Sequence, residues 1–96
     1  MPRKKLTDKI VEKVNNELEE DEKGVFIVVY DFKGRSYNPK EFYQALTRLK
    51  DEGYFMDRIQ KSVYLVDSLK TAMIISELGK HYGAEVKCYK VEKEVF

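Results

Sequence analysis

Residues 57–67 read DRIQKSVYLVD, and this stretch decides the fold. Apolar and polar residues alternate along most of it, which is typical of strands that bury one face. We therefore predict two short strands within residues 54–66, joined by a tight connection near Lys61. The same stretch carries Arg58, Gln60 and Ser62, and the burial of one strand face does not explain why these positions are polar.

Helical periodicity marks three further segments. Their limits, as set by caps and glycine stops, are residues 6–24, residues 38–53 and residues 67–83. The first predicts an amphipathic helix over residues 6–20, followed by an acidic linker that ends at Gly24. Asp67 or Ser68 caps the third helix, and Gly79 inside it lowers its helix propensity by about 1 kcal/mol relative to alanine.

The remaining segments complete a sheet. Residues 25–32, VFIVVYDF, form an almost continuously apolar run, which predicts a central strand covered on both faces. Residues 84–89 alternate as a last strand, and residues 91–96 form a separate edge strand or a tail. The order predicts an α+β, ferredoxin-like β-α-β-β-α-β domain with an antiparallel sheet over residues 25–96, preceded by an N-terminal helix and linker over residues 1–24. A partner chain, the N-terminal helix and nucleic acid are the candidates for covering the second face of the sheet.

The composition is that of one globular domain. The chain has 96 residues, of which 43% are hydrophobic, and its charges nearly cancel at a net charge of +1. This balance excludes a long basic surface of the histone kind but leaves room for a small basic patch. We expect no membrane span, no secretory signal and, with Cys88 alone, no internal disulfide, which together favour the cytoplasm. The excess of Glu and Lys over Asn and Gln is typical of proteins from very hot environments.

Two sequence blocks resemble a known family. VVYDF ends an apolar strand in Tyr30 and Asp31, and RIQKSVY follows at residues 58–64. Together they resemble the CRISPR-associated protein two family, the small ferredoxin-like endonucleases of the CRISPR adaptation complex, whose second block reads approximately Arg-Ile/Val-Gln-x-Ser-Val-Phe. The resemblance covers roughly residues 25–91. The helix at residues 6–20 has no counterpart in typical members, and the turns that often carry arginines after the Asp read PKEFYQ here.

The resemblance implies a homodimer with metal-dependent endonuclease activity on RNA or DNA. Asp31 is the implied catalytic and metal-binding residue, with one copy from each chain meeting at the two-fold axis around Mg²⁺ or Mn²⁺. Hard divalent cations prefer carboxylate and phosphate oxygens, so two such carboxylates and a phosphate form a coherent ligand set. The resemblance also implies a CRISPR integrase protein as a further partner. The plain alternative for Asp31 is a turn or cap residue at a strand end.

Basic side chains are the candidate contacts to nucleic-acid phosphates. They are Lys33, Arg35, Arg58 and Lys61. The alternatives are a solvated loop for the first two residues and, for Arg58, an ion pair with Asp57 or with an acidic helix residue.

Four residues would support the site, namely Tyr30, Gln60, Ser62 and Tyr64. The alternative for Gln60 and Ser62 is to satisfy backbone groups at the strand connection. The alternative for Tyr64 is packing in the core or at a dimer interface.

Three functions stay open on these grounds. The first is a nuclease or nuclease-like protein centred on Asp31. The second is a non-catalytic dimer that binds nucleic acid through Arg35, Arg58 and Lys61. The third is an assembly module whose N-terminal helix and sheet bind only protein. The fold alone does not decide among them. We also expect each chain to lend its last strand to a partner, which would cover an open sheet edge.

Overall fold

The computed structural model describes residues 6–32 and 40–92 as an α+β domain. Its elements are α1 (Leu6–Glu17), β1 (Lys23–Asp31), α2 (Lys40–Asp51), β2 (Met56–Gln60), β3 (Val63–Ser68), α3 (Leu69–His81) and β4 (Glu85–Val91). The strands form one antiparallel sheet in the order β2-β3-β1-β4. This order is that of a ferredoxin-like fold with an added N-terminal helix, as the sequence predicted.

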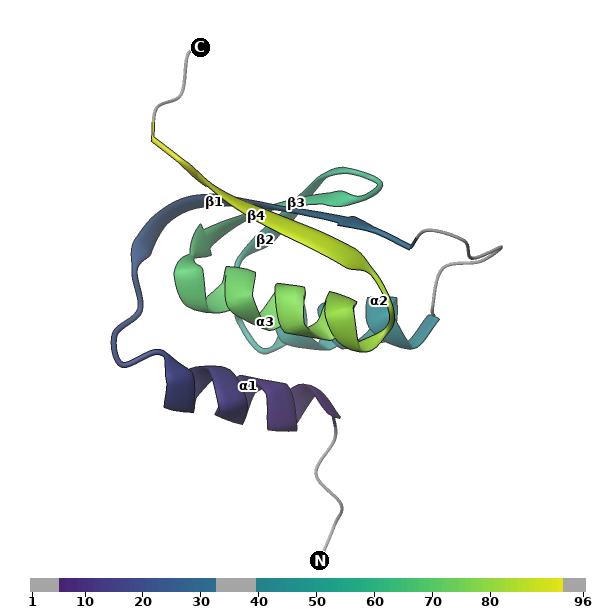
Figure 1. Ribbon diagram of the computed structural model, residues 1–96, viewed down its shortest axis with the longest axis horizontal. Helices are drawn as coiled ribbons and strands as arrows, with labels where there is room; N and C mark the ends of the chain where they lie inside the picture. The colour runs from purple at the N-terminus through teal and green to yellow at the C-terminus, as the bar shows by residue number, and fades with distance from the viewer. Residues whose placement is uncertain (1–5, 33–39, 93–96) are drawn as a thin grey trace, which may run out of the picture.

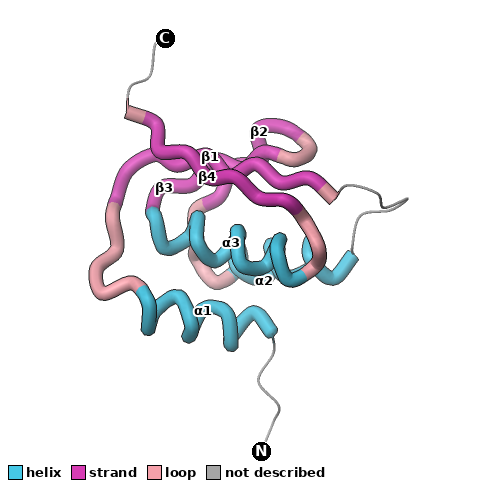
Figure 2. The backbone as a smooth tube through the Cα atoms, in the orientation of Figure 1, coloured by secondary structure: helices cyan, strands magenta, loops and turns pink. Residues whose placement is uncertain are grey.

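Three layers make up the molecule, as Figures 1 and 2 show. The sheet is the first layer, α2 and α3 cover one of its faces, and α1 packs on the outer side of α3. Ile10 and Val14 of α1 are buried at that contact. Two ion pairs flank it, one between Lys13 Nζ and Glu77 Oε2 at 3.2 Å and one between Arg48 Nη2 and Asp8 Oδ1 at 3.3 Å. The N-terminal helix therefore does not cover the second face of the sheet.

The acidic segment after α1 differs from the prediction. The helix ends at Glu17 instead of residue 20, and Gly24 lies inside β1 instead of serving as the helix stop. Acidic side chains at a helix C-terminus oppose the helix dipole, whereas at an N-terminus they favour it. Here the linker places Asp21 at the start of α3, where its carboxylate accepts a hydrogen bond from the Lys70 N–H at 2.9 Å.

The cap and glycine signals that fall on described residues are confirmed for α3 and for the ends of α2 and α3, whereas the predicted start of the second helix at residues 38–39 lies outside the described residues. Ser68 is the N-cap of α3, and its hydroxyl oxygen accepts a hydrogen bond from the Thr71 N–H at 3.2 Å. Gly53 and Gly83 follow α2 and α3 with φ of 102° and 91°, a conformation that favours glycine. Strands β2 and β3 flank the connection at Lys61, and their pairing shifts register between Arg58 and Gln60.

The two faces of β1 have different surroundings. Phe26, Val28 and Tyr30 point toward the helices and are buried, whereas the alternate residues Val25, Ile27, Val29 and Asp31 point away and are exposed or half-buried. β1 is a central strand as predicted, but the described residues cover only one of its faces. Val91 belongs to β4 and pairs with Val25, and the rest of the proposed edge strand (residues 93–96) lies outside the described residues. Within the described ranges, no helix is both long and apolar enough to cross a bilayer.

Gly79 of α3 packs closely against the start of β4. A Cβ added there would lie 2.8 Å from Val86 Cγ2 and 3.7 Å from Ala84 Cβ. The sequence marked this glycine as a weak point of the helix, but its missing side chain is what lets the helix approach the strand.

We predict that Gly79→Ala lowers the free energy of unfolding by about 1–2 kcal/mol, because overpacking against a stiff β-branched side chain outweighs the better helix propensity of alanine. Urea unfolding measures the change. In a Val86→Ala background, which removes the obstructing methyl groups, the same substitution should cost less. Greater stability of the single variant would contradict the close-packing role.

Candidate functional site

The connection between β2 and β3 is organised around one backbone carbonyl. The Lys61 oxygen accepts hydrogen bonds from the Tyr30 hydroxyl at 2.9 Å, from Arg58 Nη2 at 2.9 Å and from Arg58 Nε at 3.3 Å. Close by, the Tyr30 N–H donates to the Ser62 carbonyl at 3.1 Å. Arg58 therefore has a local purpose, since its side chain and the Tyr30 hydroxyl together fix the tight connection against the central strand.

Tyr30 is the centre of a buried aromatic cluster. Its ring contacts those of Phe32, Phe42 and Tyr43 edge-on, with centroids 5.0 to 6.4 Å apart, and it stacks on Tyr64 at 6.1 Å. Burial, together with the neighbouring Tyr43 hydroxyl, raises the pKa of Tyr30 far above its usual value. Burial also raises the pKa of Tyr64, although Arg58 opposes the shift. Both hydroxyls therefore keep their protons at neutral pH.

Arg58 points toward the helix layer. Its guanidinium carbon lies 5.3 Å from the centre of the Tyr43 ring of α2, close enough for a cation–π contact. It forms no ion pair with a described carboxylate, so the surface pair with Asp57 or with a helix acid is absent from the described chain. Gln60 is exposed and Ser62 half-buried, and neither side chain hydrogen-bonds to a described residue.

Asp31 lies on the opposite face of the sheet. Tyr30 and Asp31 are consecutive in β1, so their side chains point to opposite sides. Asp31 pairs with Glu85 of β4, and both line a hollow of about 210 Å³ together with Val29, Tyr30 and Lys87. Two carboxylates side by side across a strand pair repel each other unless a cation is near. Within the described residues, no three His, Cys, Asp or Glu side chains form a group that could hold a metal.

The structure thus separates the predicted site residues. Asp31 lies on the uncovered face, whereas Tyr30, Arg58 and Tyr64 lie on the helix side and Lys61 is exposed at the connection. Lys33 and Arg35 lie outside the described residues. Sequence reasoning missed Tyr43 and Lys50 of α2, which face Arg58 across the layers, and Glu85 and Lys87 of β4 beside Asp31. The alternation of β4 could have indicated the latter two, since it sets them on one side of their strand.

We predict that Tyr30→Phe lowers the free energy of unfolding by about 1 kcal/mol, because a buried hydroxyl loses its bond to the Lys61 carbonyl. Tyr64→Phe is the matched control. It removes a hydroxyl from the same cluster that has no hydrogen bond to a described residue, so it should change stability by less than about 0.5 kcal/mol. Equal effects in denaturant titrations would argue against the role of Lys61 as an anchor.

Comparison with known proteins leaves the site to be judged on its own geometry. No family model, no curated protein and no solved structure matches this chain. The functional argument therefore depends on the two sequence blocks, on the ferredoxin-like fold and on the position of Asp31.

Proposed function

We propose that this protein is a cytoplasmic homodimer that acts as a divalent-metal-dependent nuclease, or as a nuclease-like nucleic-acid-binding protein, of the kind that the CRISPR-associated protein two family represents. One observation carries the proposal. Asp31 lies at the margin of an apolar sheet face that no described element covers, so a second copy packed on that face about a two-fold axis parallel to β1 would bring the two Asp31 carboxylates to the same end of the interface.

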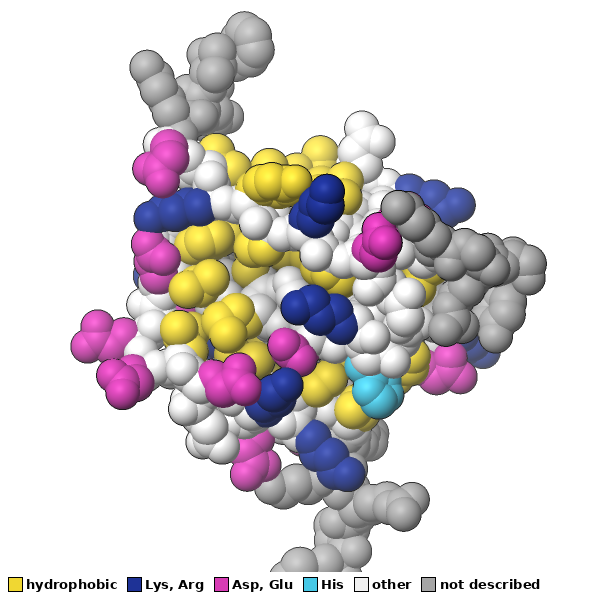
Figure 3. Space-filling model, in the orientation of Figure 1, with side chains coloured by type: hydrophobic (Ala, Val, Ile, Leu, Met, Phe, Trp, Pro, Cys, Tyr) yellow, Lys and Arg dark blue, Asp and Glu magenta, His cyan; other side chains and the backbone are white. Residues whose placement is uncertain are grey.

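The uncovered face has the character of an interface. Antiparallel sheets with one face in water normally alternate apolar and polar residues. The two central strands instead present Ile27, Val29, Val63 and Leu65 on this side, in directly opposed pairs. Val25 and Tyr89 extend the same surface and are 40% and 53% exposed. Figure 3 shows hydrophobic side chains gathered along its upper edge, on the side of the sheet away from the helices.

Charged residues surround this apolar centre. Asp31, Glu85 and Lys87 lie at one end of the face and Asp67 at the other. An apolar core within a polar rim is typical of protein–protein interfaces, and an isologous pairing about a two-fold axis is the commonest form. A second copy of this chain is therefore the occupant that we propose for the face.

The donor set at the margin fits a hard cation. Carboxylate oxygens from Asp31 of each copy, with Glu85 as the cross-strand neighbour, are the ligands that Mg²⁺ or Mn²⁺ prefers. Such an ion would supply charge neutralisation at a phosphodiester. The chain itself would hold the two Asp31 carboxylates at a fixed separation, because each lies on a rigid strand. The apolar side chains of the face would exclude water from the interface beneath them.

A second function is favoured by the position of Arg58. This arginine is the residue that the family resemblance would bring to the phosphate, yet its guanidinium is bound to the Lys61 carbonyl on the opposite face of the sheet. A dimer that binds nucleic acid or assembles with a protein such as a CRISPR integrase, without cleaving, is consistent with this arrangement. The cleavage experiment separates the two functions.

We predict cleavage of single-stranded RNA or duplex DNA in Mg²⁺ or Mn²⁺ and none in chelator. Asp31→Asn should lower the rate by about 100-fold, because a charge that acts directly at the reacting group is lost. Asp51→Asn is the matched control, an identical charge change at an exposed position at the end of α2, on the other side of the sheet. Salt-dependent binding without cleavage would support the second function, and equal rates for both variants would overturn the role of Asp31.

The assembly makes a prediction of its own. The wild-type chain should be a dimer by light scattering at micromolar concentration, and Leu65→Lys should be a monomer, because it places a charge at the centre of the apolar face. Lys80→Glu changes charge on an exposed position of α3, on the far side of the sheet, and should remain dimeric. A monomeric wild type would overturn the proposed interface.

A further inference from the structure

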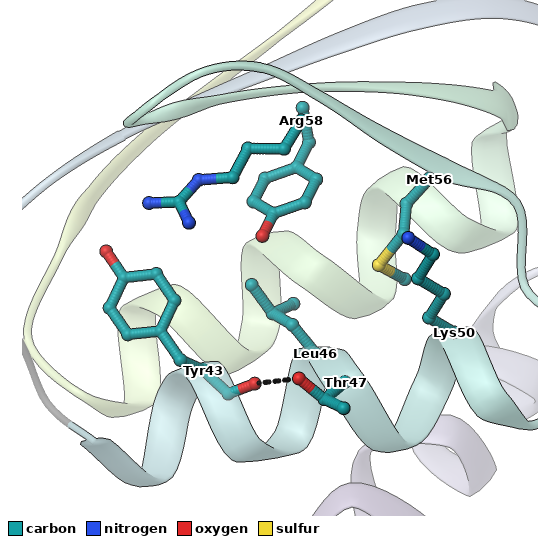
Figure 4. Close-up of a pocket in the computed structure, with 7 residues that line it drawn as sticks. Tyr43, Leu46, Thr47, Lys50, Met56 and Arg58 are labelled. Atoms are coloured by element: carbon teal, nitrogen blue, oxygen red, sulfur yellow. Dashed lines mark hydrogen bonds between the residues drawn. The ribbon is translucent and has the colours of Figure 1, made fainter.

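A cavity of about 300 Å³ lies between α2 and the β2–β3 strand pair, and we call it the α2–β2 cavity. It is lined by Tyr43, Leu46, Thr47 and Lys50 of α2, by Met56 and Arg58 of β2 and by Tyr64 of β3. Figure 4 shows its two ends, with Arg58 reaching toward Tyr43 at one end and Lys50 beside Met56 at the other. Leu46 and Met56 are buried and offer little surface to a ligand, so each end can bind only through its own polar groups.

The Arg58 end contains a hydroxyl group without a partner. Arg58 and Tyr64 are directly opposed in the β2–β3 pairing, so both side chains enter the cavity from adjacent strands on the same side of the sheet. Tyr64 is 8% exposed, and its hydroxyl forms no hydrogen bond with a described residue. Among the described side chains, Arg48 Nη1 is the one unpartnered polar atom that is sealed from solvent, so the Tyr64 hydroxyl is open to the cavity.

The guanidinium of Arg58 is held in place but not neutralised. Its Nε and Nη2 atoms donate to the Lys61 carbonyl at 3.3 and 2.9 Å, and its central carbon lies 5.3 Å from the centre of the Tyr43 ring. No described residue accepts a hydrogen bond from its Nη1. The other arginine within the described ranges, Arg48, has two carboxylate partners. Because Arg58 is already fixed, it loses little conformational entropy when it binds an anion.

The two polar groups at this end are both donors. A guanidinium has no acceptor atom, and the Tyr64 hydroxyl keeps its proton because burial raises its pKa, although Arg58 opposes the shift. One guanidinium balances one negative charge, and the other cation of the described lining, Lys50, lies at the far end. A second negative charge in this partly buried place would stay uncompensated. The site therefore selects a monoanion with acceptor oxygens, and the planar carboxylate matches the planar guanidinium.

We infer that the Arg58 end of the α2–β2 cavity binds a single carboxylate group, carried either by a small organic acid or by an acidic side chain of a partner protein. Arg58 Nη1 and the Tyr64 hydroxyl donate to its oxygens. This site lies on the helix side of the sheet and does not depend on Asp31 or on the proposed dimer.

The test is an NMR-monitored titration of the intact protein at pH 7 and constant ionic strength. The probes are acetate and acetamide, and a blocked Gly-Glu-Gly peptide with its Gly-Gln-Gly counterpart. We expect at least one of the acids to bind at least about tenfold more tightly than its amide, with shifts centred on Arg58 and Tyr64, because hydrogen bonds to a charged acceptor are the stronger ones. Tighter binding of the peptide assigns the carboxylate to a protein, and acetate binding as tight assigns it to a small acid. Equal binding of acids and amides would overturn the inference.

A nucleic-acid strand is the competing ligand. A strand carries one negative charge on every nucleotide, whereas this end of the cavity offers one cation, so the site suits an isolated charge better than a row of charges. An unphosphorylated tetranucleotide should therefore bind no more tightly than the acidic peptide at the same ionic strength. Tighter binding of the tetranucleotide, with shifts at Arg58 and Tyr64, would overturn the assignment to a carboxylate.

Variants assign the binding to these side chains. Tyr64→Phe should weaken binding of the acid by about three- to tenfold, because one donor is lost. Tyr54→Phe, which removes a hydroxyl outside the cavity, is its matched control and should have no effect. Arg58→Lys keeps the charge but loses the planar donor group, and should also weaken binding. Lys50→Gln should change binding by less than about twofold, because its charge lies at the far end and is screened by solvent. Equal effects of Lys50→Gln and Arg58→Lys would mean diffuse attraction and would overturn the site.

Discussion

The alternation of side chains along β1 is the constraint on which the rest of this molecule depends. Tyr30 and Asp31 are neighbours in the chain, yet the first points into the aromatic core and the second to the uncovered face. A shift of one residue in the pairing of this strand would exchange every side chain between the two faces. The hydrogen bond from the Tyr30 hydroxyl to the Lys61 carbonyl links β1 to the β2–β3 connection and so helps to fix the register.

Two chemically different surfaces follow from that constraint. The helix side offers cations and hydroxyls between α2 and the β2–β3 strand pair, whereas the other side offers an apolar centre with carboxylates at its margin. Neither surface is occluded by α1, because that helix packs on α3 in a third layer. The extra helix therefore adds core without covering either surface.

Local signals made most of the fold predictable. The Ser68 cap, the two glycine stops and the change from alternation to helical spacing depend only on neighbouring residues, and they gave the right elements in the right order. The end of α1 was wrong because the acidic segment is stabilised by α3, a contact distant in sequence. The role of Arg58 was not predictable for a similar reason, since its acceptor is a backbone carbonyl that no residue type marks. Lys50 and Tyr64 line one cavity only once helix and strands are packed.

The two edge strands of the sheet, β2 and β4, differ in the regularity of their pairing. β2 is short, and its pairing is interrupted between Arg58 and Gln60, where a bulge disturbs the regular spacing of backbone groups. β4 pairs with β1 without interruption from Val91 to Glu85, so its outer row of amide and carbonyl groups is evenly spaced. An extended peptide can add to a sheet only where such a row is regular. The edge at β4 is therefore the one whose regular geometry suits the addition of a further strand, whereas the bulge blunts the edge at β2.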